Sequence, residues 1–89
     1  MHYEVIIKNK IYNIDCHIHD DQIFVCNFSI NQNYRKRGYS RRILNKLQNK
    51  YKKPIYLECF PTLKNFYEKL GFEFICSTVD GYNEMMRRY

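Results

Sequence analysis

The residues with the clearest chemical potential lie around Gly38, in the stretch NQNYRKRGYSRRILNKL that covers residues 31–47. Arg35, Lys36 and Arg37 directly precede this glycine, and a pattern typical of a helix follows it. A helix that begins after a strand leaves backbone N–H groups without partners and carries a partial positive charge, so it attracts phosphate. Glycine has no Cβ, so an anion can approach the backbone closely. The stretch predicts an anion-binding loop, with a nucleic acid and a phosphorylated cofactor both open as its partner.

Histidines and cysteines are the other residues that could do chemistry. His17 and His19 have the spacing of an H-x-H metal pair on a strand, and Asp15 and His2 are the nearby residues that could add ligands. We favour exposed strand histidines and predict no metal site. The four cysteines, without any C-x-x-C pair, are Cys16, Cys26, Cys59 and Cys76. Their wide spacing favours reduced thiols, mostly in the core, over a zinc site or a disulfide framework.

Hydrophobic periodicity predicts the elements that position these residues. The first thirty residues alternate as an antiparallel meander, with turns at Asn9-Lys10 and Asp20-Asp21. A strand, a helix and a second strand then predict a parallel βαβ unit, and Asp80-Gly81 predicts a hairpin turn. The expected strands cover 3–8, 11–19, 23–30, 55–60, 72–79 and 82–89, and the expected helices cover 39–51 and 62–70. This is a mixed α/β (α+β) chain of order β-β-β-α-β-α-β-β.

The second predicted helix carries an apolar stripe with one tyrosine. Pro61 and Thr62 indicate its start, with Thr62 as the N-cap, and Gly71 indicates its end. Leu63, Phe66, Tyr67 and Leu70 share one face of this helix.

Composition limits the class of protein. At 89 residues, 45% of them hydrophobic, the sequence predicts one folded domain over residues 1–89. A net charge of +6 favours an anionic partner without choosing among nucleic acid, membrane surface and cofactor. No apolar run approaches the roughly 20 residues that span a bilayer, and MHYEVIIKNK lacks the features of a signal peptide, so we expect a cytoplasmic protein without a membrane partner.

Two motifs, INQNYRKRGYSRRILNKL and NFYEKLGFEF, together resemble the acetyl-CoA-binding core of the GNAT superfamily of N-acetyltransferases. In that family a strand ends in an apolar residue, a loop carries (Gln/Arg)-x-x-Gly-x-(Gly/Ala), and a leucine-bearing helix follows. Ile30 matches the strand end, and Arg35 and Gly38 match the first and fourth loop positions. FYEKLGF is similar to the family's helix-to-strand signature and places Tyr67 on its tyrosine position. The resemblance covers about residues 23–89. It favours a phosphorylated cofactor over a nucleic acid as the partner of the anion-binding loop.

The resemblance implies acetyl-CoA as co-substrate and a GNAT-like fold that lacks the family's first two helices. Acetyl-CoA is expected between the diverging strands 23–30 and 55–60. Its pyrophosphate is expected on the amides of residues 35–40, and its pantetheine beside residues 28–30. The implied cofactor-binding residues are Phe28, Ser29, Ile30, Arg35, Lys36, Arg37, Gly38, Tyr39 and Ser40.

The same resemblance implies that Tyr67 is the acid that protonates the leaving thiolate. It also implies that a backbone N–H near Phe28 donates the hydrogen bond that stabilises the oxyanion. Glu58, on the strand opposite the cofactor, is the candidate general base. A solvated strand glutamate, with solvent as the base, is the alternative. Two interpretations are open for Cys59: a nucleophile that becomes acetylated, or an inert cysteine of the core.

The sequence also departs from the family pattern. Ser40 stands where the family prefers Gly or Ala, Lys36 replaces a frequent glycine, and Phe60 and Pro61 occupy the neighbourhood of an asparagine that many members carry. We therefore expect altered phosphate contacts. The two missing helices usually form a wall of the acceptor site, so this site is expected to be open.

The leading hypothesis is an N-acetyltransferase that moves an acetyl group from acetyl-CoA to an amine, with a protein lysine favoured by the open site. Very small acetyltransferases of this kind are similar to ones found in bacteriophages. One alternative is a catalytically inactive binding module with the same fold. Another, less favoured, is a nucleic-acid-binding protein that uses Arg42, Lys46 and Lys50 on the outer helix face. A homodimer whose second copy rebuilds the missing wall is left open.

Overall fold

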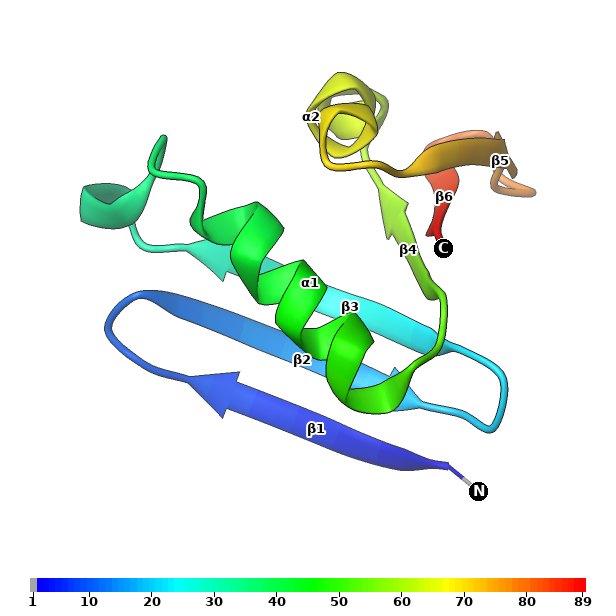
Figure 1. Cartoon of the computed structure of the whole chain (residues 1–89). Coiled ribbons are helices and arrows are strands. Elements are labelled where there is room, and N and C mark those ends of the chain that lie inside the picture. The colour runs from blue at the N-terminus through cyan, green and yellow to red at the C-terminus, as the bar shows by residue number, and fades with distance from the viewer. Residues whose placement is uncertain (1) are drawn as a thin grey trace.

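The computed structural model describes residues 2–89, which form a six-stranded mixed sheet with two α-helices (Figure 1). The strands are β1 (Tyr3–Lys8), β2 (Tyr12–Ile18), β3 (Ile23–Ile30), β4 (Ile55–Cys59), β5 (Glu73–Ser77) and β6 (Glu84–Arg88). The helices are α1 (Tyr39–Tyr51) and α2 (Lys64–Lys69), with short 3-10 turns η1 (Gln32–Tyr34) and η2 (Pro61–Leu63). The mixed α+β class and the element order predicted from the sequence are confirmed.

The sheet has the strand order β1-β2-β3-β4-β6-β5. The first three strands form the predicted antiparallel meander, and β3 pairs with β4 in parallel, connected through α1. The predicted C-terminal hairpin is β5 and β6, of which β6 also pairs with β4. The connection of β3 to β4 through a helix is what brings the start of α1 to the end of β3.

A tight turn joins β1 to β2 and explains the absence of helices between them. The Asn9 side-chain oxygen accepts hydrogen bonds from the backbone N–H groups of Ile11 and Tyr12, both at 2.9 Å. The Asn9 N–H also donates to the Tyr12 carbonyl at 3.0 Å. An asparagine that bonds to the backbone two or three residues ahead is the chemistry expected of a short turn. The absence of the two helices, which the sequence predicts, therefore follows from this short turn.

One hydrophobic core joins both helices to the sheet. Leu44 and Leu47 of α1 and Tyr67 and Leu70 near α2 pack with the inward residues of the strands. The buried strand residues are Ile14, Cys16, Ile18, Ile23, Val25, Ile55, Leu57, Cys59, Phe72 and Met86. Burying each large apolar side chain stabilises the fold by about 1.5–3 kcal/mol, so Leu44 and Leu47 fix α1 on the sheet.

The cysteines divide evenly, which corrects the expectation that most are core residues. Cys16 and Cys59 are buried, whereas Cys26 and Cys76 are exposed, and all four are free thiols. Cys26 lies where the register between β2 and β3 shifts. This irregularity interrupts the alternation of inward and outward side chains along β3, from which the position of Cys26 would otherwise be predicted.

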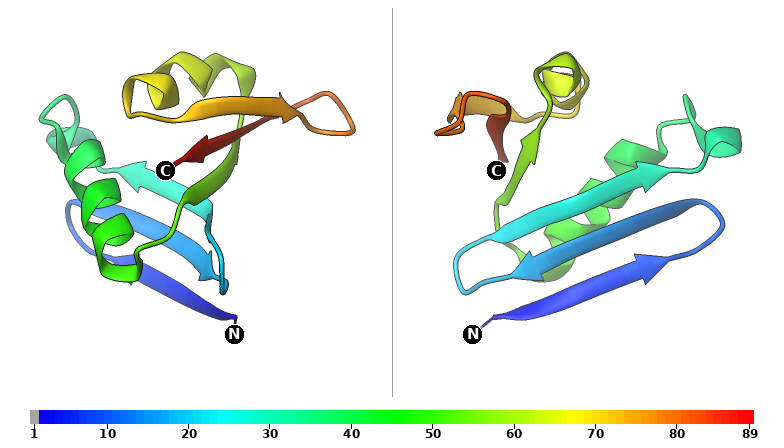
Figure 2. Two further views of the ribbon diagram at one scale, coloured as in Figure 1. Left: turned by 45° about the vertical axis from the view of Figure 1, so that its right-hand side comes forward. Right: turned by 180° about the vertical axis from the view of Figure 1, so that it is seen from behind.

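The face of β1, β2 and β3 that points away from α1 carries no helix among residues 2–89, as the rear view in Figure 2 shows. Strand register sets one row of side chains across the entire sheet: Glu4, His17, Phe24, Tyr56, Arg87 and Glu73. Exposed and half-buried polar and aromatic groups thus occupy the face where a three-layered protein would have a second core.

The sheet has two halves that meet along a short seam. β3 and β4 pair only between Ile23–Val25 and Ile55–Leu57, and beyond these residues the two strands diverge (Figure 1). Arg88 of β6 supports the seam from one side, because its guanidinium donates to the Gln48 side chain of α1 at 2.9 Å. The divergence predicted for the cofactor site is therefore present.

One local prediction about an element end is wrong, whereas the predicted hairpin turn at Asp80-Gly81 is present within a wider loop. Thr62 does not cap the second helix: Pro61–Leu63 form a 3-10 turn, α2 begins at Lys64, and no side chain caps it. The β5–β6 connection is wider than a two-residue Asp80-Gly81 turn, since Thr78 N–H donates to the Asn83 carbonyl at 2.9 Å. Within residues 2–89, neither helix has the length and apolar character needed to cross a membrane.

Candidate active site

The start of α1 presents free backbone donors at the end of β3. Gly38 is the N-cap residue, with φ +76°, and it has no side chain to cap the helix. The first turn carries no acidic residue. The first N–H groups of any helix lack intrahelical partners and carry partial positive charge. This end of α1 is therefore free to receive an anion.

The loop before the helix is shaped by a second left-handed residue. Lys36 adopts φ +62°, a conformation that favours glycine and costs other residues about 1–2 kcal/mol. This backbone conformation explains why the family that the sequence resembles often has a glycine at this position. Here the loop keeps the same conformation with a lysine. Two left-handed residues within three positions turn the backbone sharply in front of α1.

Arginines on either side of Gly38 tie the loop to its surroundings. Arg35 Nε donates to the Ile30 carbonyl at 3.0 Å, so this side chain turns back to the end of β3. Arg41 donates to the Lys69 carbonyl at the end of α2. These contacts give both arginines a positioning role and link the two helices across the site.

These elements surround a hollow of about 640 Å³. Eight of the nine predicted cofactor-binding residues line it: Phe28, Ser29, Ile30, Arg35, Lys36, Gly38, Tyr39 and Ser40. Arg37 does not line it; its guanidinium lies 5.9 Å from the centre of the Tyr34 ring. The strand end, the loop and the helix start therefore meet in one cavity.

Five further residues line the same hollow and were not predicted: Tyr34, Arg41, Leu63, Phe66 and Leu70. Leu63, Phe66 and Leu70 form an apolar wall on the α2 side. Their helical stripe was visible in the sequence, but its orientation toward the loop depends on how α2 packs.

Tyr67 lies in this wall and borders the hollow. Its side chain is only 8% exposed and makes edge-on ring contacts with Phe66 at 5.0 Å and Phe72 at 5.4 Å between ring centres. Burial, followed by the nearby Cys59 thiol, raises the pKa of Tyr67. A buried tyrosine with a raised pKa stays protonated at neutral pH and can donate a proton.

Glu58 lies apart from this arrangement. Its side chain is exposed and accepts a hydrogen bond from Asn83 Nδ2 at 2.9 Å, and Glu58 is absent from the lining of the hollow. The structure therefore brings Tyr67 together with the loop residues but leaves the predicted general base outside. Cys59 is buried, and burial raises the pKa of its thiol, so its reactive thiolate form is disfavoured.

Comparison with known proteins identifies the family. The model of the GNAT acetyltransferase domain matches residues 3–74. The chain belongs to the GNAT acetyltransferase family. No curated protein matches the sequence.

Solved structures of acyltransferases and of an anti-CRISPR protein share the fold at low sequence identity. The anti-CRISPR protein AcrVA5 is 20% identical with a TM-score of 0.72, covering 97% of this chain and 98% of its own. An acetyltransferase from Bacillus cereus is 16% identical with a TM-score of 0.74, covering 99% of this chain and 72% of its own. An acyl-CoA N-acyltransferase from Pseudomonas aeruginosa is 17% identical with a TM-score of 0.65, covering 89% and 60%. The GNAT fold is therefore present within a chain of 89 residues.

Proposed function

We propose that this protein is an N-acetyltransferase that transfers an acetyl group from acetyl-CoA to an amine, with a lysine side chain of another protein as the acceptor. One observation carries the proposal: the uncapped start of α1, the end of β3 and Tyr67 all border the same hollow of about 640 Å³. Family membership supplies the reaction class, and the hollow supplies a place for the donor.

In this proposal the pyrophosphate binds the free N–H groups at Gly38, Tyr39 and Ser40. Phosphate at a helix start is favoured by the unpaired donors and by the helix dipole. The pantetheine arm then follows β3 beside Phe28 and Ile30, where β4 has diverged and leaves this edge open. The α2 wall excludes water from the arm on its other side.

Acetyl transfer requires a neutral amine, stabilisation of the oxyanion and a proton for the leaving thiolate. Tyr67 is the proton donor in this mechanism because it borders the hollow and keeps its proton at neutral pH. A backbone N–H near Phe28 stabilises the oxyanion. Solvent removes the proton from the amine, because Glu58 is exposed and engaged by Asn83.

The preference for a protein acceptor follows from the open face of the sheet. No helix among residues 2–89 covers the side of β1–β3 that faces away from α1. A small amine has few groups there to hold it, whereas a lysine on a protein is held by contacts outside the site. The lysine side chain is also long enough to reach a recessed thioester.

The first experiment is calorimetric titration of the purified protein with acetyl-CoA, with ATP and a short DNA duplex as controls. Selective binding of acetyl-CoA supports the donor site, and mass spectrometry of protein mixtures incubated with the enzyme then identifies acetylated lysines. Binding of acetyl-CoA without transfer to any amine favours an inactive binding module. Binding of DNA alone, with a steep salt dependence, contradicts the proposal.

A further inference from the structure

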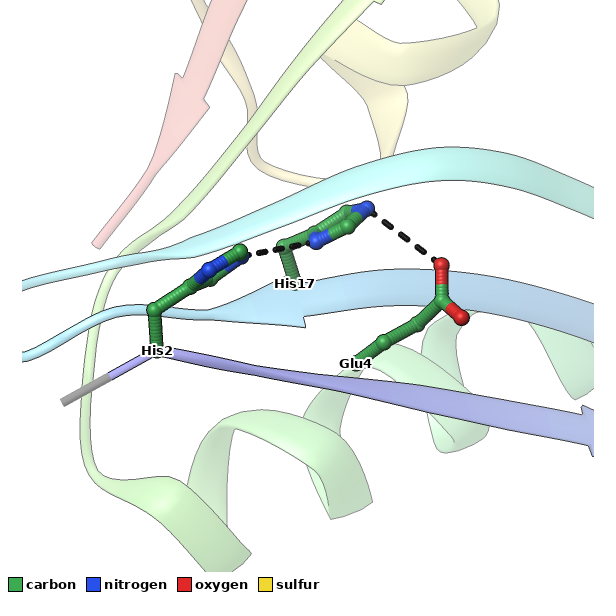
Figure 3. Close-up of polar contacts among 3 residues, drawn as sticks. All are labelled: His2, Glu4 and His17. Atoms are coloured by element: carbon green, nitrogen blue, oxygen red, sulfur yellow. Dashed lines mark hydrogen bonds and ion pairs between the residues drawn. The ribbon is translucent and has the colours of Figure 1, made fainter.

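A second cluster of functional side chains lies on the uncovered face of the sheet, outside the hollow described above. Glu4 on β1 and His17 on β2 are register partners, so their side chains stand next to each other (Figure 3). Asp15 lies two residues before His17 on the same strand and therefore on the same face. His2 precedes β1 and points its ring toward His17.

The spacing of these groups fits a metal ion. One ligand atom each from Glu4, Asp15 and His17 lies within 4.8 Å of the others. His17 Nε2 and Glu4 Oε2 are 3.5 Å apart. Two donors that each bind zinc at about 2.0–2.2 Å in tetrahedral geometry lie roughly 3.4 Å from each other. The histidine and the glutamate are therefore already separated as two ligands of one ion would be.

Asp15 provides a second, independent observation. Its Oδ1 atom is buried from solvent and has no hydrogen-bond partner in the structure. A buried carboxylate oxygen without a partner is costly, because it loses its hydration without compensation. A cation between Asp15, Glu4 and His17 would supply the missing interaction.

His2 is placed to hold His17 in the form that a metal requires. His2 Nε2 lies 2.8 Å from His17 Nδ1. If His17 carries its proton on Nδ1 and donates it to His2, the lone pair of Nε2 points toward Glu4. Metal-binding histidines characteristically donate their second N–H to an acceptor in this manner, which orients the ring and raises its basicity.

We propose that Glu4, Asp15 and His17 bind one divalent transition-metal ion, for which Zn²⁺ is the probe. One imidazole nitrogen and two carboxylates suit such an ion, and three protein ligands leave a fourth position for water. His19 is not among the residues whose ligand atoms come together within 4.8 Å, and its ring stacks on that of His2 with ring centres 4.5 Å apart. The H-x-H pair considered from the sequence thus gives way to a set that includes Glu4, which only the β1–β2 register reveals.

The consequence for the molecule is a clamp on an edge strand. β1 is the edge of the sheet and is paired only with β2. An ion held by Glu4 from β1 and by two residues from β2 would join these strands. This role does not depend on the proposed acetyl transfer.

The test is calorimetric titration of the untagged full chain with Zn²⁺ after treatment with a chelator, for the wild type and matched variants. We expect one ion per chain, and loss of binding in Glu4→Gln and in His17→Gln. Glu73→Gln is the control, because Glu73 is an exposed strand glutamate beside a cationic partner on the opposite edge of the same sheet, and it should bind Zn²⁺ as the wild type does. His2→Leu should weaken binding about 10–100-fold.

A second measurement keeps the test decisive if a variant folds poorly. Co²⁺ added to the wild type should produce the intense visible absorption of a four-coordinate site, and the thermal midpoint should rise by several degrees with Zn²⁺. The proposal is overturned if the wild type binds no Zn²⁺, or if Glu4→Gln and His17→Gln, shown to be folded by circular dichroism, bind it with wild-type affinity.

Discussion

At the scale of single residues, Gly38 determines whether an anion can reach the start of α1. A Cβ added at Gly38 would meet no protein atom within 4 Å, so the space in front of it is open to a ligand. Only its φ of +76° opposes a side chain. A glycine at this position can therefore serve two separate purposes: it adopts the left-handed backbone conformation, and it lets a ligand approach the backbone.

Gly38→Val should abolish binding of acetyl-CoA, because the branched side chain would fill the path to the backbone amides. Gly81→Val is a matched control, since Gly81 has φ +77° and equally open surroundings but lies in the β5–β6 connection. Both variants should lose a similar free energy of unfolding, about 1–2 kcal/mol or somewhat more for a branched side chain. Calorimetry with acetyl-CoA should distinguish them, and wild-type affinity in Gly38→Val would refute the phosphate site.

Tyr67→Phe should lower the rate of acetyl transfer by about 10²–10⁴-fold while leaving the affinity for acetyl-CoA nearly unchanged. The reason is that phenylalanine retains the ring contacts with Phe66 and Phe72 and removes only the hydroxyl. Steady-state kinetics and calorimetry on the same preparation provide the two readouts. An unaltered rate would remove Tyr67 from the mechanism.

The raised pKa of Tyr67 also has a consequence for stability. Because the folded protein favours the neutral phenol, this contribution is fully present below the ordinary tyrosine pKa of about 10 and is lost as the pH rises through the raised value. The free energy of unfolding of the wild type should therefore fall more steeply above about pH 10 than that of Tyr67→Phe. Urea unfolding across this range provides the measurement.

At the scale of elements, α1 carries the proposed phosphate site and is held to the sheet by two leucines. Leu44 is fully buried, so Leu44→Ala should lower the free energy of unfolding by about 2–5 kcal/mol. Lys46→Ala, on the exposed side of the same helix, should change it by less than about 0.5 kcal/mol. Urea unfolding compares the two, and a loss in Leu44→Ala no larger than in Lys46→Ala would show that α1 is not fixed by this stripe.

Elements were largely predictable from the sequence because their signals are local. The alternation in β1 to β3, the leucine spacing in α1 and the short polar breaks each depend on neighbouring residues. The start of α2 was misplaced because Thr62 has the chemistry of an N-cap, whereas the chain after Pro61 first forms a 3-10 turn that shifts the helix to Lys64.

The residues of the two candidate sites were predictable where they are close in the sequence, and were not where only strand packing brings them together. Eight lining residues between Phe28 and Ser40 were predictable as a group because they lie close together in the chain and match a family motif, whereas Tyr34 was missed and Arg37 does not line the hollow. Glu58 was harder, because whether β4 reaches the hollow depends on how β4 diverges from β3, and no residue of β4 lines it. Glu4 was missed entirely, because its place beside His17 depends on strand register, which periodicity does not fix.

At the scale of the whole molecule, the proposed donor site is divided between two halves. The loop and α1 belong to the half with β1–β3, while Tyr67 belongs to the half with β4–β6. The sheet joins these halves through three residue pairs of β3 and β4, from Ile23↔Ile55 to Val25↔Leu57. Contacts outside the sheet therefore matter for the width of the hollow.

Arg88 makes the principal such contacts. Its guanidinium donates to the side chains of Gln48 and Asn45 on α1 and, at 2.8 Å, to the Leu70 carbonyl after α2. Gln48 Nε2 returns a bond to the Arg88 carbonyl at 2.9 Å. One arginine of the second half is thereby bonded to α1, the helix of the first half at whose start we propose the phosphate site.

Arg88→Met should lower the free energy of unfolding by roughly 2–3 kcal/mol, because hydrogen bonds to a charged group are lost while the apolar stem is kept. It should also weaken acetyl-CoA binding severalfold, since the two walls of the hollow are no longer held together by this side chain. Arg87→Met is the control: Arg87 lies on the opposite face of β6, where it forms a partly exposed ion pair with Glu73 at 3.7 Å. This substitution should lower the free energy of unfolding by at most about 1 kcal/mol without affecting acetyl-CoA binding. Urea unfolding and calorimetry measure both effects. If Arg88→Met were destabilised but bound acetyl-CoA as tightly as the wild type, the remaining links between the halves, which are the β3–β4 seam, the Arg41–Lys69 contact and the shared core, would be enough to position them.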